Sequence, residues 1–532
     1  MNGYLIALIV FLAWIALVYV LHRIKWFDRH SMSLQGPMIL WKTKRGRDLI
    51  DRIASRSRVW RLYGKVSLWI CAVAMAIIMS LLLWEATIVT RVDQAPSPEL
   101  ILGIPGINPV IPVGYGILGL VIAIVVHEFA HGIMTRVGGM KVQSMGLVFL
   151  VFPIGAFVEP DEEELKKTTR SKRSKVFAAG PASNIVIALV VLGLFSGVMM
   201  SSIEPGTAGA LARGVVEGSP AEMAGIEPNS VIIAVDGESV LSGEALATRE
   251  SSAPGAVVDI IVAYDDEIKY VPVVDGIVVS FVAEDYAAFN AGIEAGMVLV
   301  SLNGTNLASY AMIADVMSEC HAGQTVPVTV MSYHSSLDRF ALNTSITQVT
   351  LSDKWDYYEE FNPSDNDESF RGKAFLGGGF LYLGFQAADI SYYSDMLANP
   401  FEGDRNLDDV SRSWLRLIAL PFLDLAPVRS PVTDLYTPSG YLDWMPESVF
   451  WLTANSLYWI FWLNLMVGLT NVLPAVPLDG GYIFRDAISY LLDKTGRKYT
   501  DAEKERITGS VAISLALLVL FLIIWQLVGP AF

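Results

Sequence analysis

The chemistry of this chain centres on the stretch Val125-Val126-His127-Glu128-Phe129-Ala130-His131. Residues four apart lie on one face of a helix, so His127 and His131 can both point at one metal ion. Glu128 lies beside them and can take a proton from a water molecule. Two neutral imidazoles with a carboxylate base are the usual core of a hydrolytic zinc site, and His-Glu-x-x-His is the pattern that predicts one.

The motif lies inside an apolar segment. Residues 113–135 read VGYGILGLVIAIVVHEFAHGIMT, which is long and apolar enough to span a bilayer. Histidine and glutamate are costly in such a segment and mark function by default. The alternative is a chance motif or a pair of core histidines. That alternative is weaker here because lipid makes buried polar groups expensive.

The composition indicates an integral membrane protein with a large polar part. Of 532 residues 53% are hydrophobic, and the mean hydropathy is +0.46. The net charge of −16 is unevenly spread: residues 23–65 hold twelve Lys/Arg and three Asp/Glu, whereas residues 204–447 hold eleven and thirty-six. Cys71 and Cys320 lie in segments of different kinds, so no disulfide framework is expected.

Six transmembrane helices are predicted, and charge assigns their sides. The first candidate lacks the positive N-terminus and cleavage site of a signal peptide, so we expect a retained helix. The basic loop 23–65 should be cytoplasmic by the positive-inside rule. The acidic segment 203–448 is then extracytoplasmic, and both motif histidines lie toward the cytoplasmic side of the cell membrane. The predicted spans are 3–21, 67–90, 113–135, 176–200, 449–472 and 507–528.

A fourteen-residue apolar segment, 145–158, follows the motif. It is too short to cross a bilayer, so a re-entrant or interfacial segment is expected. Its β-branched and aromatic residues suit a hairpin whose edge strand could pair with an extended substrate. A buried connector is an equally open interpretation.

The polar segment contains an internal repeat. Residues 224–237 (AGIEPNSVIIAVDG) match residues 291–304 (AGIEAGMVLVSLNG) at a spacing of 67 residues. With Ser219-Pro220-Ala221 ahead of the first copy, the pattern resembles the PDZ domains of bacterial-type proteases. The spacing is short for two complete domains, and a generic β-rich domain is the alternative. Tyr382-Leu383-Gly384-Phe385 resembles a PDZ carboxylate-binding loop, although it follows the repeats.

The third metal ligand is expected to be a carboxylate. A catalytic zinc site takes three protein ligands, and the four other histidines lie in or beside the basic loop or in the polar segment. Asp479 is the best candidate, within NVLPAVPLDGG at residues 471–481. Prolines and glycines break the helix there, which is tolerated at membrane depth where the backbone lines a cavity. Leu-Asp-Gly alone would be an ordinary turn.

Taken together, these motifs resemble the site-2 protease family of intramembrane zinc metalloproteases. The match includes His-Glu-x-x-His, the string around Asp479, and Gly180-Pro181-Ala182-Ser183-Asn184 on the fourth span. The resemblance implies that His127, His131 and Asp479 bind Zn²⁺ and that Glu128 is the base. It also implies that Asn184 positions substrate or stabilises the oxyanion. Membrane-anchored proteins would be the substrates, with the PDZ-like units as an external filter.

We therefore expect an α-helical polytopic membrane protein with a re-entrant segment and an extracytoplasmic β-rich, PDZ-like insertion. It would contact the lipid bilayer and bind no nucleic acid, and no oligomeric state is predicted. A non-catalytic receptor or scaffold that binds peptide tails is the alternative, and a transporter is a weaker third. Glu128 favours the enzyme, since a scaffold needs no base beside a metal. The predicted segments are 1–65, 66–112, 113–202 (first part of the catalytic core), 203–349 (PDZ-like units), 350–448 (an extension containing an amphipathic helix at 411–421) and 449–532 (second part of the core).

Overall fold

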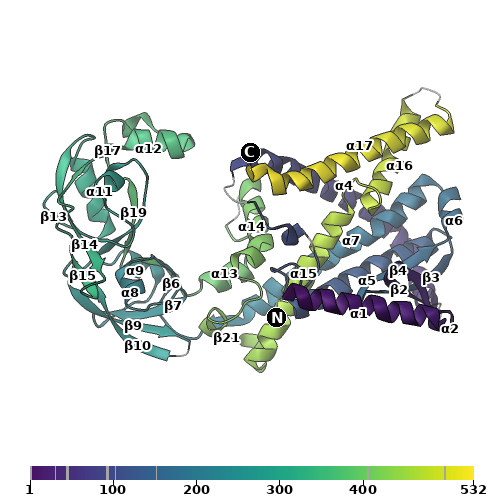
Figure 1. Ribbon diagram of the computed structural model, residues 1–532, viewed down its shortest axis with the longest axis horizontal. Coiled ribbons are helices and arrows are strands. Elements are labelled where there is room, and N and C mark those ends of the chain that lie inside the picture. The colour runs from purple at the N-terminus through teal and green to yellow at the C-terminus, as the bar shows by residue number, and fades with distance from the viewer. Residues whose placement is uncertain are drawn as a thin grey trace. The chain divides into compact units, whose positions relative to one another are not determined.

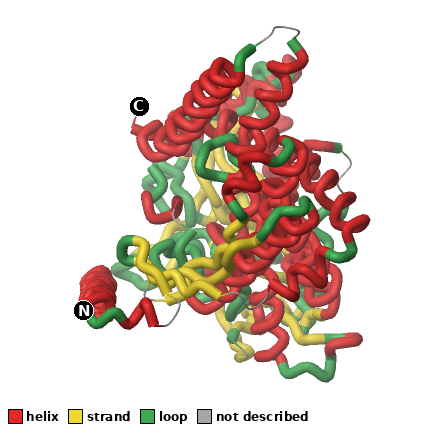
Figure 2. Tube along the Cα trace, turned by 90° about the vertical axis from the view of Figure 1, so that its right-hand side faces the viewer, coloured by secondary structure: helices red, strands yellow, loops and turns green. Residues whose placement is uncertain are grey.

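The computed structural model describes residues 3–29, 32–43, 47–91, 95–101, 103–150, 152–265, 267–403, 406–495 and 499–531. The chain folds as two units (Figure 1), and Figure 2 distinguishes its helices from its strands by colour. The helical unit comprises Met1–Val198, Gly403–Pro427 and Leu452–Phe532, and the β-rich unit comprises Met199–Glu402 and Val428–Trp451. The β-rich unit is therefore an insertion that interrupts the helical unit in sequence.

Within the described residues, five helices are long and apolar enough to cross a membrane. They correspond to the second to sixth predicted spans. The first predicted span forms helix α1 (Gly3–Arg23), whose sequence is apolar as far as Leu21. The five long helices are α4 (Ser57–Ile88), α5 (Val113–Val137), α7 (Arg170–Leu194, continued by a π turn over Phe195–Met199), α15 (Glu447–Asn471) and α17 (Asp501–Val528).

The helical unit also contains a four-stranded antiparallel sheet in the order β1-β2-β3-β4. Strands β3 (Val142–Leu150) and β4 (Phe152–Pro160) form a hairpin, which confirms the hairpin interpretation of residues 145–158. Strands β1 (Met32–Gln35) and β2 (Met38–Thr43) come from the predicted basic loop, and β2 pairs with β3. Among the described residues β4 is an edge strand, with one side open.

Shorter helices connect these elements in the helical unit. The amphipathic helix predicted at 411–421 is present as α14 (Leu407–Ala419). It packs on α15, because Tyr458 Oη donates to the Leu417 carbonyl at 2.7 Å and Trp462 Nε1 donates to the Ile418 carbonyl at 3.0 Å. The other short helices are α2 (Trp26–Arg29), α3 (Arg47–Ala54), α6 (Glu162–Lys167) and α16 (Asp479–Lys494).

The β-rich unit confirms the internal repeat element by element. The first copy contains β6 (Ala210–Val215), α8 (Pro220–Met223), β7 (Ser230–Val235), β8 (Glu238–Ser239), α9 (Gly243–Ala247), β9 (Val257–Tyr264) and β10 (Glu267–Val274). The second contains β11 (Ile277–Val282), α10 (Ala287–Asn290), β12 (Val298–Leu302), β13 (Thr305–Asn306), α11 (Tyr310–Glu319), β14 (Thr325–His334) and β15 (Arg339–Leu342). Helices α8 and α10, and likewise α9 and α11, start 67 residues apart.

Each copy is completed by a strand from further along the chain. Strand β20 (Phe385–Asp389) closes the first sheet, in the order β10-β9-β7-β6-β20. Strand β19 (Gly378–Tyr382) closes the second, in the order β15-β14-β12-β11-β19. The boundary predicted between residues 349 and 350 therefore does not follow the sheets. The 67-residue spacing is short because the last strand of each copy lies outside the repeat.

The remaining elements surround these sheets. Strand β16 (Gln348–Thr350) pairs with β14, and β17 (Ser352–Asp353) pairs with β18 (Ala374–Phe375). Helix α12 (Lys354–Phe361) follows β17, and α13 (Tyr392–Ala398) follows β20. Strand β5 (Ile203–Pro205) pairs with β21 (Tyr436–Pro438), so the chain enters and leaves the β-rich unit side by side.

The contact between α9 and β20 allows a test of whether β20 completes the first sheet. A Cβ at Gly243 would collide with the backbone of Ala388 in β20, whereas a Cβ at Gly206 would meet its nearest atoms only at 3.8 Å. Gly243→Ala should therefore destabilise the first sheet by about 1–3 kcal/mol, and Gly206→Ala should not. Hydrogen exchange of β20 amides, followed by mass spectrometry, measures the difference. Equal protection in the two variants would contradict the tight α9–β20 contact.

Candidate metal centre

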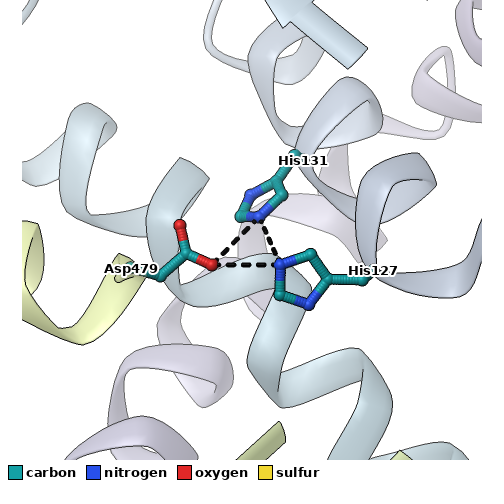
Figure 3. Close-up of side chains that lie close together, drawn as sticks. All are labelled: His127, His131 and Asp479. Carbon is teal, nitrogen blue, oxygen red and sulfur yellow. Dashed lines mark hydrogen bonds and ion pairs between the residues drawn. The ribbon is translucent and has the colours of Figure 1, made fainter. Parts of the chain in front are cut away.

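Three side chains far apart in sequence converge in the helical unit (Figure 3). His127 Nε2 lies 3.0 Å from His131 Nε2 and 3.1 Å from Asp479 Oδ2, and His131 Nε2 lies 3.2 Å from the same oxygen. Both imidazoles are buried, and Asp479 is partly buried. The structure thus brings together the three residues that the sequence singled out as metal ligands.

The donor atoms fit a small tetrahedral cation. His131 Nδ1 lies 2.7 Å from the carbonyl oxygen of Val176, which can only accept, so the proton sits on Nδ1 and Nε2 offers a lone pair. Three electron-pair donors facing one another repel unless a cation lies between them. A tetrahedral ion with bonds of about 2.0–2.1 Å separates its ligands by about 3.3 Å, close to the spacing seen here. Two imidazoles and a carboxylate are a donor set that zinc accepts.

Helix α7 makes room for such an ion with a glycine. A Cβ at Gly180 would collide with His131 Nε2 and would lie 2.8 Å from His127 Nε2. The space beside both nitrogens therefore exists only because residue 180 has no side chain. Gly180 belongs to the family motif quoted above, but its role depends on the packing of α7 against α5.

A non-helical turn between two helices brings Asp479 close to the two histidines. Helix α15 ends at Asn471, the chain turns through two prolines, and α16 begins at Asp479. A carboxylate in the first turn of a helix is favoured by the unpaired N–H groups there. Gly480 follows at once, and a Cβ on it would collide with the backbone of Val472. Glycine is therefore required for the turn to fold back on the end of α15.

An ion pair ties α16 to α7 two helical turns beyond Asp479. The buried carboxylate of Asp486 accepts hydrogen bonds from Arg173 Nε at 3.1 Å, from Arg173 Nη2, and from Ser174 Oγ at 3.0 Å. The same two helices hold Asp479 and Gly180. The bidentate pair therefore fixes the third ligand relative to α7. Sequence reasoning missed it, although both residues stand in the charged segments that flank the fourth and sixth spans.

Glu128 lies at the open edge of the sheet. Its Oε2 accepts a hydrogen bond from the backbone N–H of Val158 in β4, at 2.9 Å. Because alternate residues of a strand face the same edge, the backbone groups of Ala156 share that side with Val158. The carboxylate next in sequence to a candidate ligand thus lies beside the strand edge left free in the hairpin.

Asn184 is buried between α7 and α15, one turn beyond Gly180. It is fully buried, and neither polar atom of its amide has a hydrogen-bond partner among the described residues. Asn464 on α15 is also fully buried, and its Oδ1 is likewise unpaired within that part of the chain. Buried amides without partners are costly, so these atoms are available to a ligand or to water. No hydrogen bond within the described structure joins Asn184 to the three candidate ligands.

We expect Gly180→Ala to lower the zinc content of the purified protein well below one ion per chain. The added methyl group takes the space beside both imidazoles, while alanine favours the helix itself. Gly193→Ala is the matched control, because a Cβ at that position of α7 meets no atom within 4 Å. Elemental analysis by mass spectrometry gives the stoichiometry, and equal zinc in both variants would show that the ion does not lie against Gly180.

Asp479→Ala should weaken zinc binding by more than roughly 10–100-fold, the loss in affinity typical of substitutions at residues that only hydrogen-bond to a metal ligand. The variant removes one of three donors but leaves the imidazole pair. Competition with a zinc chelator measures the affinity, and Asp501→Ala, at the exposed start of α17, serves as control. Wild-type affinity in the Asp479 variant would require a different third ligand.

Comparison with known proteins agrees with this geometry. The family model for peptidase family M50 matches residues 115–520. An uncharacterised protein of Methanocaldococcus jannaschii is 34% identical over 178 residues, which are 32% of this chain and 46% of that protein. A Clostridium perfringens protein named "Putative zinc metalloprotease" is 33% identical over 135 residues, covering 24% of this chain and 38% of its own length.

A protein of Agrobacterium fabrum with the same name is 24% identical over 197 residues, covering 30% of this chain and 51% of its own length. The chain thus spans about half or less of the curated relatives it matches. The family match is broader, since it covers more than half of this chain and includes all three candidate ligands. The chain therefore belongs to peptidase family M50, the site-2 protease family.

Proposed function

We propose that this protein is an intramembrane zinc endopeptidase that cuts membrane-anchored proteins within or near their transmembrane helices. The observation that supports this most is the placement of the donor atoms. Three of them lie within 3.2 Å of one another, and two belong to α5, a helix apolar enough to span a bilayer. Polar residues at such a depth are retained for function.

Zinc held by His127, His131 and Asp479 would acidify a water molecule and polarise the scissile carbonyl. Glu128 would accept the proton that the water loses and pass it to the leaving amine. Its carboxylate already lies at the open side of β4, held by the Val158 amide. A substrate that reaches this edge therefore meets the base directly.

The edge of β4 supports a way to hold the substrate. A peptide bond inside a helix is hydrogen-bonded and shielded, so the substrate helix must unwind before it is cut. The unwound stretch needs new partners for its backbone groups, which lipid does not supply. Strand addition to β4 at Ala156, two residues before the Val158 amide that holds Glu128, would supply them and place the extended chain next to Glu128.

Buried amides support the next steps. Asn184 lies one helical turn after Gly180 on α7. Its amide has no hydrogen-bond partner among the described residues, so it could donate to the oxyanion of the substrate. Asn464 has an unpaired carbonyl oxygen on the facing helix. Both amides would line the polar path by which water reaches the site.

The charge pattern supports a role in regulated intramembrane proteolysis. The basic residues of 23–65 favour a cytoplasmic position for that region, and the acidic β-rich unit would then lie outside. PDZ-like units there would act as a filter, admitting substrates whose bulky outer domain has already been removed. This filter follows from the family resemblance and from the repeated fold of the two sheets.

Glu128→Gln should keep the zinc content of the wild type and lower cleavage by at least about 100-fold, because an amide cannot act as the base. The measurement is cleavage of a panel of single-span membrane proteins by the purified full chain in lipid nanodiscs. Glu162→Gln on α6 makes the same chemical change at an exposed position and should cut normally.

Two results would overturn the proposal. Cleavage by Glu128→Gln at close to the wild-type rate would show that Glu128 is not the base. Wild-type protein with a full complement of zinc that cuts none of the panel would favour the receptor or scaffold instead.

A further inference from the structure

Helix α4 has an exposed face that is basic at its start and apolar beyond. Arg58, Arg61 and Lys65 are exposed and lie three or four residues apart, so they form one stripe along the helix, here called the basic stripe. Trp69 and Val73 continue the same line at intervals of four residues, and their side chains are 74% and 54% exposed. The basic stripe therefore leads directly into an exposed apolar surface.

The opposite face of α4 packs on α5 and α7. A Cβ at Gly64 would collide with Met134 of α5 and would lie 3.4 Å from Lys175 of α7. Tyr63 Oη lies 2.6 Å from Ser183 Oγ of α7. The buried residues of this face, again three or four apart, are Gly64, Ser67, Cys71 and Ala74. They lie about half a helical turn from the basic stripe, which therefore points away from α5 and α7.

The apolar part of the exposed face matches a bilayer in length. Helix α4 is one of the five helices that are apolar enough to cross a membrane. From Val66 to Trp84 it rises about 27 Å, close to the roughly 30 Å of a hydrocarbon core. The large apolar side chains exposed along this rise are Val66, Trp69, Val73, Ile77, Leu83 and Trp84. The basic stripe ends at Lys65, one residue before this stretch, so it lies at the level of the lipid headgroups.

The direction of helical side chains keeps these charges at that level. The Cα–Cβ bonds of a helix lean toward its N-terminus, so the stripe's side chains extend away from the hydrocarbon core. Their methylene stems can lie along apolar neighbours while the charged ends stay in the polar layer. Val59 and Leu62 are such neighbours, since they alternate with the cations in sequence and are 63% and 64% exposed. Cations interleaved with exposed apolar side chains fit an amphiphile better than a free ion.

The three cations of the basic stripe have no acceptor within the described part of the chain. Cations that flank the following spans are paired instead. Lys166 Nζ lies 3.2 Å from Glu162 Oε2, and Lys167 Nζ lies 3.0 Å from Glu163 Oε2. Arg136, Arg170 and Arg173 likewise pair with Asp51, Asp493 and Asp486. The chain thus neutralises those cations itself and leaves the basic stripe open to an external anion.

We propose that the basic stripe binds the headgroup of an anionic phospholipid in the leaflet at that end of α4. The lipid phosphate accepts hydrogen bonds from Arg58, Arg61 and Lys65, and the acyl chains pack along Leu62 and Trp69. A zwitterionic headgroup carries a cation of its own, which the stripe repels, so a net negative charge is selected. This site does not include the metal centre, so its test is separate from that of the protease activity.

The test uses the full chain, purified in detergent and freed of lipid. The probes are a phosphatidylglycerol and a phosphatidylcholine with identical acyl chains, and native mass spectrometry counts the lipids bound during titration. The first phosphatidylglycerol should bind at least about tenfold more tightly, because three cations attract its net charge. Glycerol 3-phosphate at the lipid's concentration should not displace it, since it has no acyl chains. Equal affinities for the two lipids, or displacement by glycerol 3-phosphate, would overturn the proposal.

Variants locate the site. The triple variant Arg58→Gln, Arg61→Gln and Lys65→Gln should bind the two lipids within about twofold of each other, and Arg61→Gln alone should reduce the preference by at least about threefold. Glutamine is a good helix former, and an unchanged zinc content shows that the variant is folded.

The matched control removes three cations that already have glutamate partners, at 3.7, 3.2 and 3.0 Å: Lys141→Gln, Lys166→Gln and Lys167→Gln. It should keep the full preference for phosphatidylglycerol. Full preference in both stripe variants, or an equal loss in the control, would show that the lipid does not bind at the basic stripe.

Discussion

The metal centre depends on one electrostatic constraint: two imidazole nitrogens and a carboxylate oxygen lie within 3.2 Å of one another in a buried site. Without a cation between them, these lone pairs repel strongly, since little water is present to screen them. The surrounding fold holds the donors in place nevertheless. Helix α5 supplies both nitrogens from one face, Val176 fixes the tautomer of His131, and α16 begins at the carboxylate. The arrangement therefore suits a bound cation.

Two glycines and a helix break allow the helices around the candidate metal site to approach one another closely. Gly180 lets α7 approach both imidazoles, and Gly480 lets the start of α16 fold against the end of α15. The Arg173–Asp486 pair then ties α16 to α7. Edge strand β4 brings a backbone amide to Glu128. Each of these features positions either a candidate ligand or the candidate base.

Local patterns predicted much of this structure. The helical spacing of His127 and His131, the apolar length of five spans, and the hairpin after the motif were all readable, because each depends on neighbours in sequence. Pairings between distant segments were not. The pairing of β2 with β3, and the completion of each repeat by β19 or β20, join residues about a hundred or more positions apart. Tyr382–Phe385 did signal a loop before an edge strand, but only the fold shows which sheet that strand completes.

Zinc K-edge X-ray absorption on the full chain in lipid nanodiscs tests the central claim most directly. The account predicts nitrogen and oxygen ligands at about 2.0–2.2 Å, with the scattering signature of two imidazoles and no sulfur. Cys71, whose buried Sγ donates to the carbonyl of Ala178 at 3.4 Å, lies outside the proposed ligand set. A sulfur ligand at about 2.3 Å, or fewer than two imidazoles, would contradict the convergence of His127, His131 and Asp479 on the ion.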